Sequence, residues 1–176
     1  MEQLLDKALL GNTKAFEELM NPYIKVLYNY IHSNISNTED IQDILQETIL
    51  AVWQGLKGFK RNSTFKTWII GITRRKIADF YRRYYNNEYF GTLESKDIQN
   101  ISSSLDEIGN VINSIDIEKS LATLSLKDKE LLFLIFNAQL SYGEIAEITG
   151  IPKGTIKSRM YYLKDKLRPL LEERGV

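Results

Sequence analysis

The sequence predicts an all-α protein: two small helical domains joined by a flexible linker, the second domain a helix-turn-helix. Only three prolines and ten glycines interrupt the 176 residues. Apolar residues recur at spacings of three and four, which is the period of a helix with one buried face. No stretch alternates polar and apolar residues as a half-buried strand would. We expect the domains at residues 1–85 and 116–176, with the linker at 86–115.

Composition excludes several classes of protein. The chain has no cysteine and a single histidine, His32, so it offers no thiolate site and little for metal binding or proton transfer. No apolar run is long enough to span a membrane, and the N-terminal residues lack the basic-then-apolar order of a signal peptide. Neither a phosphate-binding glycine loop nor a supported pair of carboxylates is evident. We therefore expect a cytoplasmic protein that is not an enzyme, with no cofactor, no metal and no membrane insertion.

Charge is unevenly distributed although the chain is formally neutral, with 23 basic and 23 acidic side chains. Residues 1–56 carry eight acids and three bases, whereas residues 57–85 carry nine bases and one acid. Residues 86–118 carry seven acids and one base, and residues 119–176 carry ten bases and seven acids. Such blocks indicate separate surfaces for separate partners. The simpler alternative is that each block is a solvated helix face.

The clearest amphipathic helix is predicted at residues 38–59, TEDIQDILQETILAVWQGLKGF. Thr38 is expected to cap its N-terminus, and the acidic residues that follow suit the positive end of the helix dipole. Apolar residues follow helical spacing through the segment, while the carboxylates of Asp40, Asp43 and Glu47 share another face. Taken alone, this acidic face would be an ordinary solvent-exposed one.

The next helix is expected to start at Ser63 or Thr64, and it carries basic and aromatic side chains together. Residues 73–87, TRRKIADFYRRYYNN, place five bases among four aromatic rings. Basic side chains contact phosphates, and exposed rings stack on unpaired bases. The segment is therefore a candidate for binding single-stranded nucleic acid. Alternatively the rings belong to the core, as we expect for Phe80, and the arginines only solubilise the helix.

Residues 86–115 break the helical periodicity. The segment is rich in Asn, Ser and acidic residues, with three consecutive serines at 102–104. This composition cannot bury much apolar surface, and it predicts a linker of low helical commitment between the two domains.

Residues 140–167, LSYGEIAEITGIPKGTIKSRMYYLKDKL, have the pattern of a helix-turn-helix. Ser141 and Glu144 are spaced as a capping box. Gly150 suits the left-handed position that ends a helix, and Pro152 suits the start of the next one. The supporting core is expected from upstream apolar residues, namely Leu121, Leu124, Leu126, Leu131, Leu132, Leu134, Ile135 and Phe136.

The second helix of this motif has an apolar side and a polar side. Ile156, Met160, Leu163 and Leu167 repeat at spacings of four, three and four and should face inward. The outward residues would then be Thr155, Ser158, Tyr161 and Tyr162, with Lys157 and Arg159 on the flanks. Small polar and basic side chains on the first turns of such a helix suit a DNA major groove. The alternative is a plain helical hairpin that packs on another surface.

Together these segments resemble the extracytoplasmic-function sigma factors, the small bacterial transcription initiation factors. DIQDILQETILAVWQGLKGF is similar to the polymerase-binding helix of the family. STFKTWIIGITRRKIADFYRR is similar to its promoter-melting and minus-ten recognition helix, and residues 140–167 to its minus-thirty-five helix-turn-helix. The motifs occur in the family order, around a linker of about the usual length, and the likeness covers nearly the whole chain.

The resemblance implies a sigma factor that directs core RNA polymerase to promoters, while the phosphodiester chemistry belongs to the polymerase. Its partners would be the β′ and β subunits of the core enzyme, promoter DNA and an anti-sigma factor. The acidic linker would thread through the polymerase channel and imitate nucleic acid there.

The resemblance also implies three sets of contact residues. Polymerase contacts would come from Asp40, Asp43, Ile44, Gln46, Glu47 and Leu50. The melted minus-ten strand would be held by Lys66, Trp68, Arg74, Arg75, Lys76, Asp79, Tyr81, Arg82 and Arg83. The minus-thirty-five duplex would be read by Lys153, Gly154, Thr155, Lys157, Ser158, Arg159 and Tyr162.

One position departs from the family pattern. Where members often carry an Arg-Asn pair, this sequence has Arg74 and Arg75. The implied minus-ten base preference therefore does not carry over at Arg75, although a phosphate contact does. The remaining alternative is a helix-turn-helix regulator that binds duplex DNA without being a polymerase subunit. Such a regulator would need neither the polymerase-binding helix nor the melting cluster, and it would more often bind a palindrome as a dimer.

Overall fold

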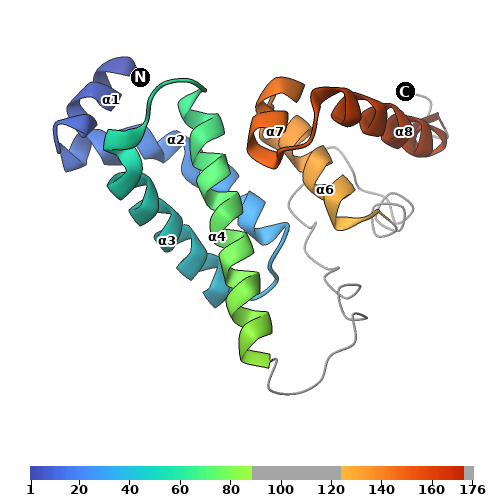
Figure 1. The fold of residues 1–176 in the computed structure, drawn as a ribbon, viewed down its shortest axis with the longest axis horizontal. Helices are drawn as coiled ribbons and strands as arrows, with labels where there is room; N and C mark the ends of the chain where they lie inside the picture. The colour runs from blue at the N-terminus through green and yellow to red at the C-terminus, as the bar shows by residue number, and fades with distance from the viewer. Residues whose placement is uncertain (89–123, 173–176) are drawn as a thin grey trace. The chain divides into compact units, whose positions relative to one another are not determined.

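The computed structural model describes residues 1–88 and 124–172. The chain divides into two compact units, residues 1–98 and 99–176, and each is described by itself (Figure 1). Within the two described stretches every regular element is helical, so the predicted all-α class with two helical units is confirmed. None of the helices in these stretches is long and apolar enough to cross a membrane.

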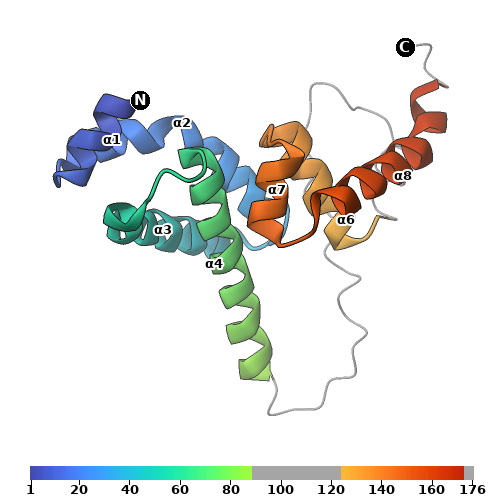
Figure 2. The ribbon, with the colours of Figure 1, turned by 45° about the horizontal axis from the view of Figure 1, so that its top comes forward.

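The first unit is a bundle in which α2 (Thr13–His32), α3 (Thr38–Gly55) and α4 (Phe65–Glu88) pack against one another. The short helix α1 (Glu2–Leu9) packs on α2, and a 3₁₀ turn, η1 (Leu56–Gly58), follows α3. The C-terminal turns of α4 extend beyond the packed part of the bundle in both views (Figures 1 and 2). The core contains fully buried aliphatic residues from all three long helices and η1: Leu19, Leu27, Ile31, Ile41, Ile44, Leu56, Ile69 and Ile70.

The starts of α3 and α4 are both capped by side chains. Asn37 rather than Thr38 caps α3, because its Oδ1 accepts hydrogen bonds from two free backbone N–H groups at 2.8 and 3.1 Å. The prediction was therefore wrong by one residue, since Asn caps at least as well as Thr and Thr38 is the first helical residue. At α4 the expected cap is confirmed: Thr64 Oγ1 accepts from the Thr67 N–H at 3.1 Å.

Helix α4 continues to Glu88, beyond the expected domain end at residue 85. Most of the predicted linker, from residue 89 onward, lies outside the described residues.

The second unit contains α6 (Leu126–Leu132), a π-helical turn η3 (Phe133–Asn137), α7 (Tyr142–Thr149) and α8 (Lys153–Glu172). Helix α8 packs on both α6 and α7. Helix α6 runs on into η3, which closes with the Ala138 N–H donating to the Phe133 carbonyl at 3.0 Å. Gln139 then adopts a φ of 52° and turns the chain toward α7.

The helix-turn-helix predicted from the sequence is present as α7 and α8. The Ser141 and Glu144 side chains form both halves of the capping box. Gly150 ends α7 with a φ of 73°, the left-handed conformation in which a side chain is strained. Pro152 directly precedes α8, and its carbonyl accepts the first helical hydrogen bond from the Ile156 N–H at 3.1 Å.

The buried and exposed sides of α8 also agree with its sequence pattern. Ile156, Met160 and Leu163 are buried and Leu167 is half-buried, while the expected outward residues are exposed.

The upstream core of this unit was predicted less well than α8. Leu126, the first residue of α6, is 38% exposed, and Phe136 is 61% exposed. Phe136 belongs to a run of apolar residues at 131–136 that encircles the helix, so only part of that run can be covered. Leu124, Leu131 and Leu134 are buried as expected, and Leu121 lies outside the described residues.

Candidate nucleic-acid interface

Helix α3 presents an acidic surface that we define as Asp40, Asp43, Gln46, Glu47 and Leu50. Its side chains share one side of the helix, and Leu50 is an apolar residue with 55% of its surface exposed. Ile44, which the sequence placed in the same contact set, is only 1% exposed. That assignment is corrected: Ile44 belongs to the core and fixes the helix, so it offers no surface to a partner.

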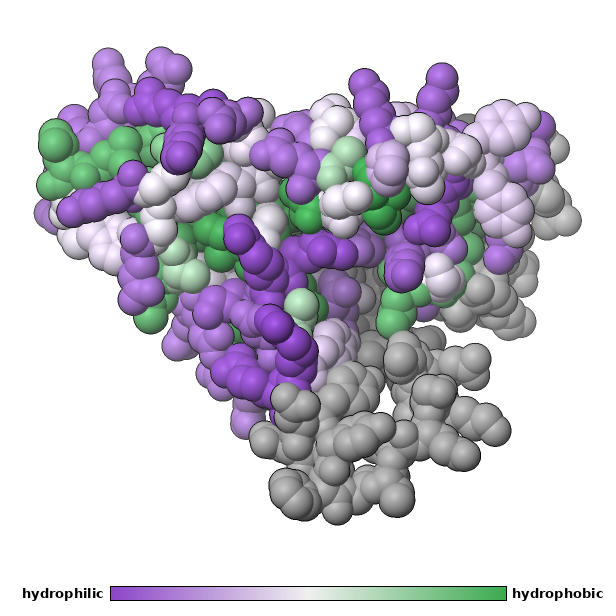
Figure 3. Space-filling view, viewed as in Figure 1, coloured by the Kyte–Doolittle hydropathy of each residue, from purple (hydrophilic) through white to green (hydrophobic). Residues whose placement is uncertain are grey.

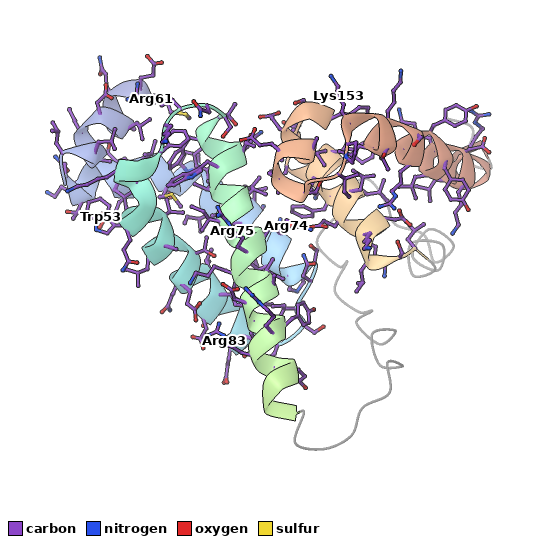
Figure 4. The ribbon with its side chains drawn as sticks, viewed as in Figure 1. Trp53, Arg61, Arg74, Arg75, Arg83 and Lys153 are labelled. Carbon is purple, nitrogen blue, oxygen red and sulfur yellow. The ribbon has the colours of Figure 1, made fainter. Side chains whose placement is uncertain are left out.

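Helix α4 carries its bases on several sides rather than one. Arg75 and Arg82 are exposed on the side facing away from the bundle core. The Arg75 Nε donates to the Gly71 carbonyl at 3.2 Å, and Arg82 forms an ion pair with Asp79 one turn earlier. Figure 4 shows Arg75 and Arg83 along the same helix. In the space-filling view, hydrophilic side chains gather over α4 and the neighbouring part of α3 (Figure 3).

Two bases of α4 point instead toward α3, where both meet one carboxylate. The Lys76 Nζ lies 3.3 Å from Glu47 Oε2, and the Arg83 Nη1 lies 3.1 Å from Glu47 Oε1. The second terminal nitrogen of Arg83 also donates to Oε1, at 3.2 Å. The structure therefore joins the acidic surface of α3 to the basic residues of α4, which the sequence had assigned to separate surfaces.

These contacts shift the titration of Glu47. Partial burial by itself raises the pKa of this carboxyl group, because burial disfavours the charged form. The hydrogen bonds and positive charges of Arg83 and Lys76 outweigh that effect, so the pKa of Glu47 lies below its ordinary value of 4.5. The group is therefore ionised at neutral pH, as its ion pairs with Lys76 and Arg83 require.

The aromatic rings of α4 fall into two groups. Trp68 packs against Phe59 and Phe65, with ring centroids 4.9 and 5.8 Å apart, and is half-buried. This cluster holds the start of α4 onto the bundle, and only the exposed part of the Trp68 ring is available to a strand. Further along, Tyr84 is 51% exposed and stacks on Phe80 at 6.2 Å. Phe80 is half-buried rather than core.

Tyr81 joins α4 to the connection between α2 and α3, because its hydroxyl donates to the Asn34 carbonyl. The ring is half-buried, so one part remains available while the hydroxyl is held in place. Lys66 and Arg74, the other bases predicted on this helix, are also half-buried.

Helix α8 presents the polar side that the sequence predicted. Lys153, Gly154, Thr155, Lys157 and Ser158 are all exposed on its first two turns. Tyr162 follows with 63% of its surface exposed. A helix with this surface, held by α7 across a tight turn, has the form of a major-groove reading helix.

Arg159 is positioned differently from its neighbours. Its Nε lies 3.6 Å from Asp128 Oδ1 on α6, and Asp128 in turn accepts a 2.7 Å hydrogen bond from the Ser125 hydroxyl. Arg159 is half-buried as a result. The side chain ties α8 to α6, so at most part of its guanidinium faces outward.

Several exposed bases were not among the predicted contacts. Lys57 and Lys60 lie in the connection just before α4, and the basic block at 57–85 was the signal that could have identified them. Lys164 lies on the same flank of α8 as Lys153 and Lys157, two turns further along, and helical spacing alone would have found it.

The described surfaces can therefore do three things. The exposed bases and the Phe80–Tyr84 pair of α4 can hold phosphates and stack on unpaired bases. The acidic surface of α3 can bind a basic protein surface. The first turns of α8 can enter duplex DNA.

Comparison with known sequence families assigns both units. The family described as sigma-70 region 2 matches residues 15–86, and the family described as sigma-70 region 4 matches residues 114–167. Together they cover most of the chain, in the order expected.

Curated relatives match this chain over nearly its full length. The chain is 25% identical over 186 residues to the ECF RNA polymerase sigma factor SigW of Bacillus subtilis, covering 98% of this chain and 100% of the relative. It is 27% identical over 188 residues to the ECF RNA polymerase sigma-E factor of Haemophilus influenzae, with 97% and 99% covered.

Solved structures share the fold. The sigma factor RpoE of Bartonella quintana, crystallised with the anti-sigma factor NepR, matches with a TM-score of 0.68 and 25% identity, covering 90% of this chain and 98% of that one. CnrH, solved in complex with the cytosolic domain of CnrY, matches in fold with a TM-score of 0.66 and 23% identity, covering 97% and 96%.

Proposed function

The chain belongs to the extracytoplasmic-function RNA polymerase sigma factors, and we propose how its surfaces direct core polymerase to promoters. The observation that carries the function is the presence of both sigma-70 regions, in order, on two helical units. Its partners are core RNA polymerase and promoter DNA. The chain supplies binding and positioning, and the polymerase supplies the chemistry, so we propose no catalytic residue, metal or cofactor here.

The acidic surface of α3 is the proposed contact for core polymerase. Asp43 and Gln46 are exposed, and Leu50 adds an uncovered apolar side chain at the same surface. An exposed apolar residue beside carboxylates suits a basic partner with a shallow apolar pocket. The β′ and β subunits are the proposed sources of that partner surface.

Helix α4 is the proposed site for the melted minus-ten strand. Arg75 and Arg82 are exposed for phosphate contact, and the Phe80–Tyr84 pair provides a ring surface for an unpaired base. Trp68 remains a proposed member only through the exposed part of its ring, because the rest packs against Phe59 and Phe65. Arg74, Lys66 and Tyr81 remain proposed members at the edges of the surface.

The first turns of α8 are the proposed reader of the minus-thirty-five duplex. Lys153 and Lys157 would contact phosphates or guanine edges, and Thr155 and Ser158 would contact base edges. Gly154 would let the helix approach the DNA closely. Arg159 would contribute only through donors that Asp128 leaves unused.

Regulation and location follow from this function as further proposals. Polymerase and promoters lie in the bacterial cytoplasm, where we propose that the protein acts. The matching structure from Bartonella quintana contains an anti-sigma factor, and we propose that an anti-sigma protein also covers the surfaces of this chain.

In-vitro transcription with core polymerase and a pool of promoter fragments from the encoding genome tests the function. A discrete start site that requires the protein is the expected result. The variant Asp43→Asn with Leu50→Ala should lose polymerase capture and the transcript together. Glu18→Gln, which removes an exposed charge from α2, serves as the matched control and should retain both.

A failure of this experiment is informative. If the wild-type protein captures no polymerase but binds a palindromic duplex tightly as a dimer, the chain acts as a duplex-binding regulator instead. If the double variant on α3 still captures polymerase, another surface makes that contact.

A further inference from the structure

Glu47 is shared between the two proposed partner surfaces of the first unit. It lies on the acidic surface of α3, yet its carboxylate is held by Lys76 and Arg83 of α4 at 3.3 and 3.1 Å. The residues are far apart in sequence, 29 and 36 positions from Glu47, so the contact depends on how α3 packs against α4. Lys76 and Arg83 bind the two carboxylate oxygens of Glu47. While they do so, these two cations are not available to a DNA phosphate.

The contact is open to competition from outside. The side chains of Glu47, Lys76 and Arg83 keep 37%, 29% and 57% of their surface exposed. Ion pairs at such exposure contribute little and exchange readily, because water and incoming charges reach them. A basic group from a partner of α3 would compete for the Glu47 carboxylate, and a phosphate would compete for its two cations.

We propose that Glu47 is an exchange residue that couples polymerase binding to capture of single-stranded DNA. In the free protein it neutralises Lys76 and Arg83 and weakens the attraction of α4 for a phosphate backbone. When a basic group of the polymerase takes the carboxylate, both cations become available to the strand. By linkage, strand binding in turn favours polymerase binding. This inference rests on the proposed function, and it assigns Glu47 a positioning role in addition to a polymerase contact.

A local ion pair on the same helix provides the contrast. Asp79 holds Arg82 one turn away, so it also neutralises a cation of α4. Asp79 does not lie on the acidic surface of α3, so a partner of that surface has no reason to displace it. Charge removal at Asp79 and at Glu47 should therefore have different consequences once polymerase is bound.

The experiment compares free protein with holoenzyme. A fluorescent single-stranded oligonucleotide, carrying the non-template sequence of the promoter found by transcription, is titrated with full-length protein alone and with protein saturated by core polymerase. Glu47→Gln keeps the size of the side chain and removes its charge. In the free protein we expect it to bind the oligonucleotide on the order of tenfold more tightly at low salt, because two cations are released.

The salt dependence gives an independent readout that a merely structural role would not change. Each additional phosphate contact steepens the slope of log K against log salt by roughly 0.7 for a single strand. Glu47→Gln should therefore steepen the slope for the free protein by up to about 1.4. In the holoenzyme the same substitution should leave affinity and slope unchanged, since the carboxylate is already engaged elsewhere.

Asp79→Asn is the matched control and should raise affinity by a similar factor in free protein and holoenzyme. Thermal denaturation of each variant confirms that the fold is retained. An equal effect of Glu47→Gln on oligonucleotide affinity in free protein and holoenzyme would overturn the proposed role of Glu47. No effect in the free protein would overturn it as well. Failure of the proposed function is distinguishable, because the wild-type protein would then form no active holoenzyme.

Discussion

At the residue scale, two adjacent polar residues of α3, Glu47 and Thr48, differ in whether packing gives their side chains a hydrogen-bond partner. Glu47 faces α4 and is satisfied by two cations. Thr48 is fully buried, and its hydroxyl has no hydrogen-bond partner among the described residues. Thr73 on α4 is equally buried, but its hydroxyl donates to the Ile69 carbonyl at 2.9 Å.

This contrast predicts opposite effects of the same substitution. Thr48→Val replaces an unsatisfied hydroxyl by a methyl group of similar size, and it should raise the free energy of unfolding by about 1 kcal/mol. Thr73→Val removes a satisfied hydroxyl and should give no gain, or a loss of up to about 1 kcal/mol. Urea denaturation of both variants measures the difference. Equal effects at the two positions would show that the Thr48 hydroxyl does have a partner.

At the scale of the element, the turn between α7 and α8 depends on the backbone conformation of one glycine. A side chain at Gly150 would meet no neighbouring atom within 4 Å, and the same is true of Gly154 at the start of α8. Of these two glycines, only Gly150 has a positive φ, of 73°. The two positions therefore separate backbone strain from steric crowding.

Alanine at these two glycines should affect stability with opposite signs. Gly150→Ala forces an L-residue into the left-handed region and should cost about 1 kcal/mol. Gly154→Ala lies in an ordinary helical turn and should be neutral or stabilising by roughly 0.5 kcal/mol. The readout is the thermal transition of the full-length protein followed by circular dichroism. A Gly150→Ala protein as stable as the wild type would mean that the turn can relax to a negative φ.

At the scale of the whole molecule, each unit has its own buried core. The first core includes Leu27 and the second includes Leu163, and both side chains are fully buried. The only two tryptophans of the sequence, Trp53 and Trp68, belong to the first unit. Tryptophan emission therefore reports on one unit, whereas circular dichroism reports on both.

We predict that core damage in one unit leaves the other unit folded. Leu163→Ala should destabilise the second unit by about 2–5 kcal/mol, giving a biphasic circular-dichroism melt with an unshifted tryptophan transition. Leu27→Ala, the corresponding change in the first unit, should lower the tryptophan transition instead. If Leu163→Ala shifts tryptophan emission in parallel with circular dichroism, the two units unfold as one cooperative system.

Local patterns predicted the elements of this protein well. The capping box at Ser141, the left-handed Gly150 and the inward side of α8 need only the spacing of nearby residues, because helix period and cap chemistry act within a few positions. The error at Thr38 arose because Asn37 has the same capping ability one residue earlier. Phe136 was misplaced because a run of apolar residues does not itself say which of them faces the core.

The predicted contact residues required more than local patterns. Ile44 lies three to four residues from Asp40 and Glu47 of the acidic surface, yet packing of α3 in the bundle leaves it only 1% exposed. Arg159 was expected on the flank of α8, and its pairing with Asp128 of α6 depends on the packing of two helices. Each case involves a partner that no short window of sequence contains.

The sequence by itself determined the helical class, the helix-turn-helix and the separation of acidic from basic blocks, because these properties reside in composition and in spacings of three and four. Only the tertiary structure decided that the acidic Glu47 is bound by Lys76 and Arg83. The physical reason is that charge pairing depends on distance in space. Packing of α3 against α4 brings together residues about 30 positions apart, and no pattern along the chain measures that distance.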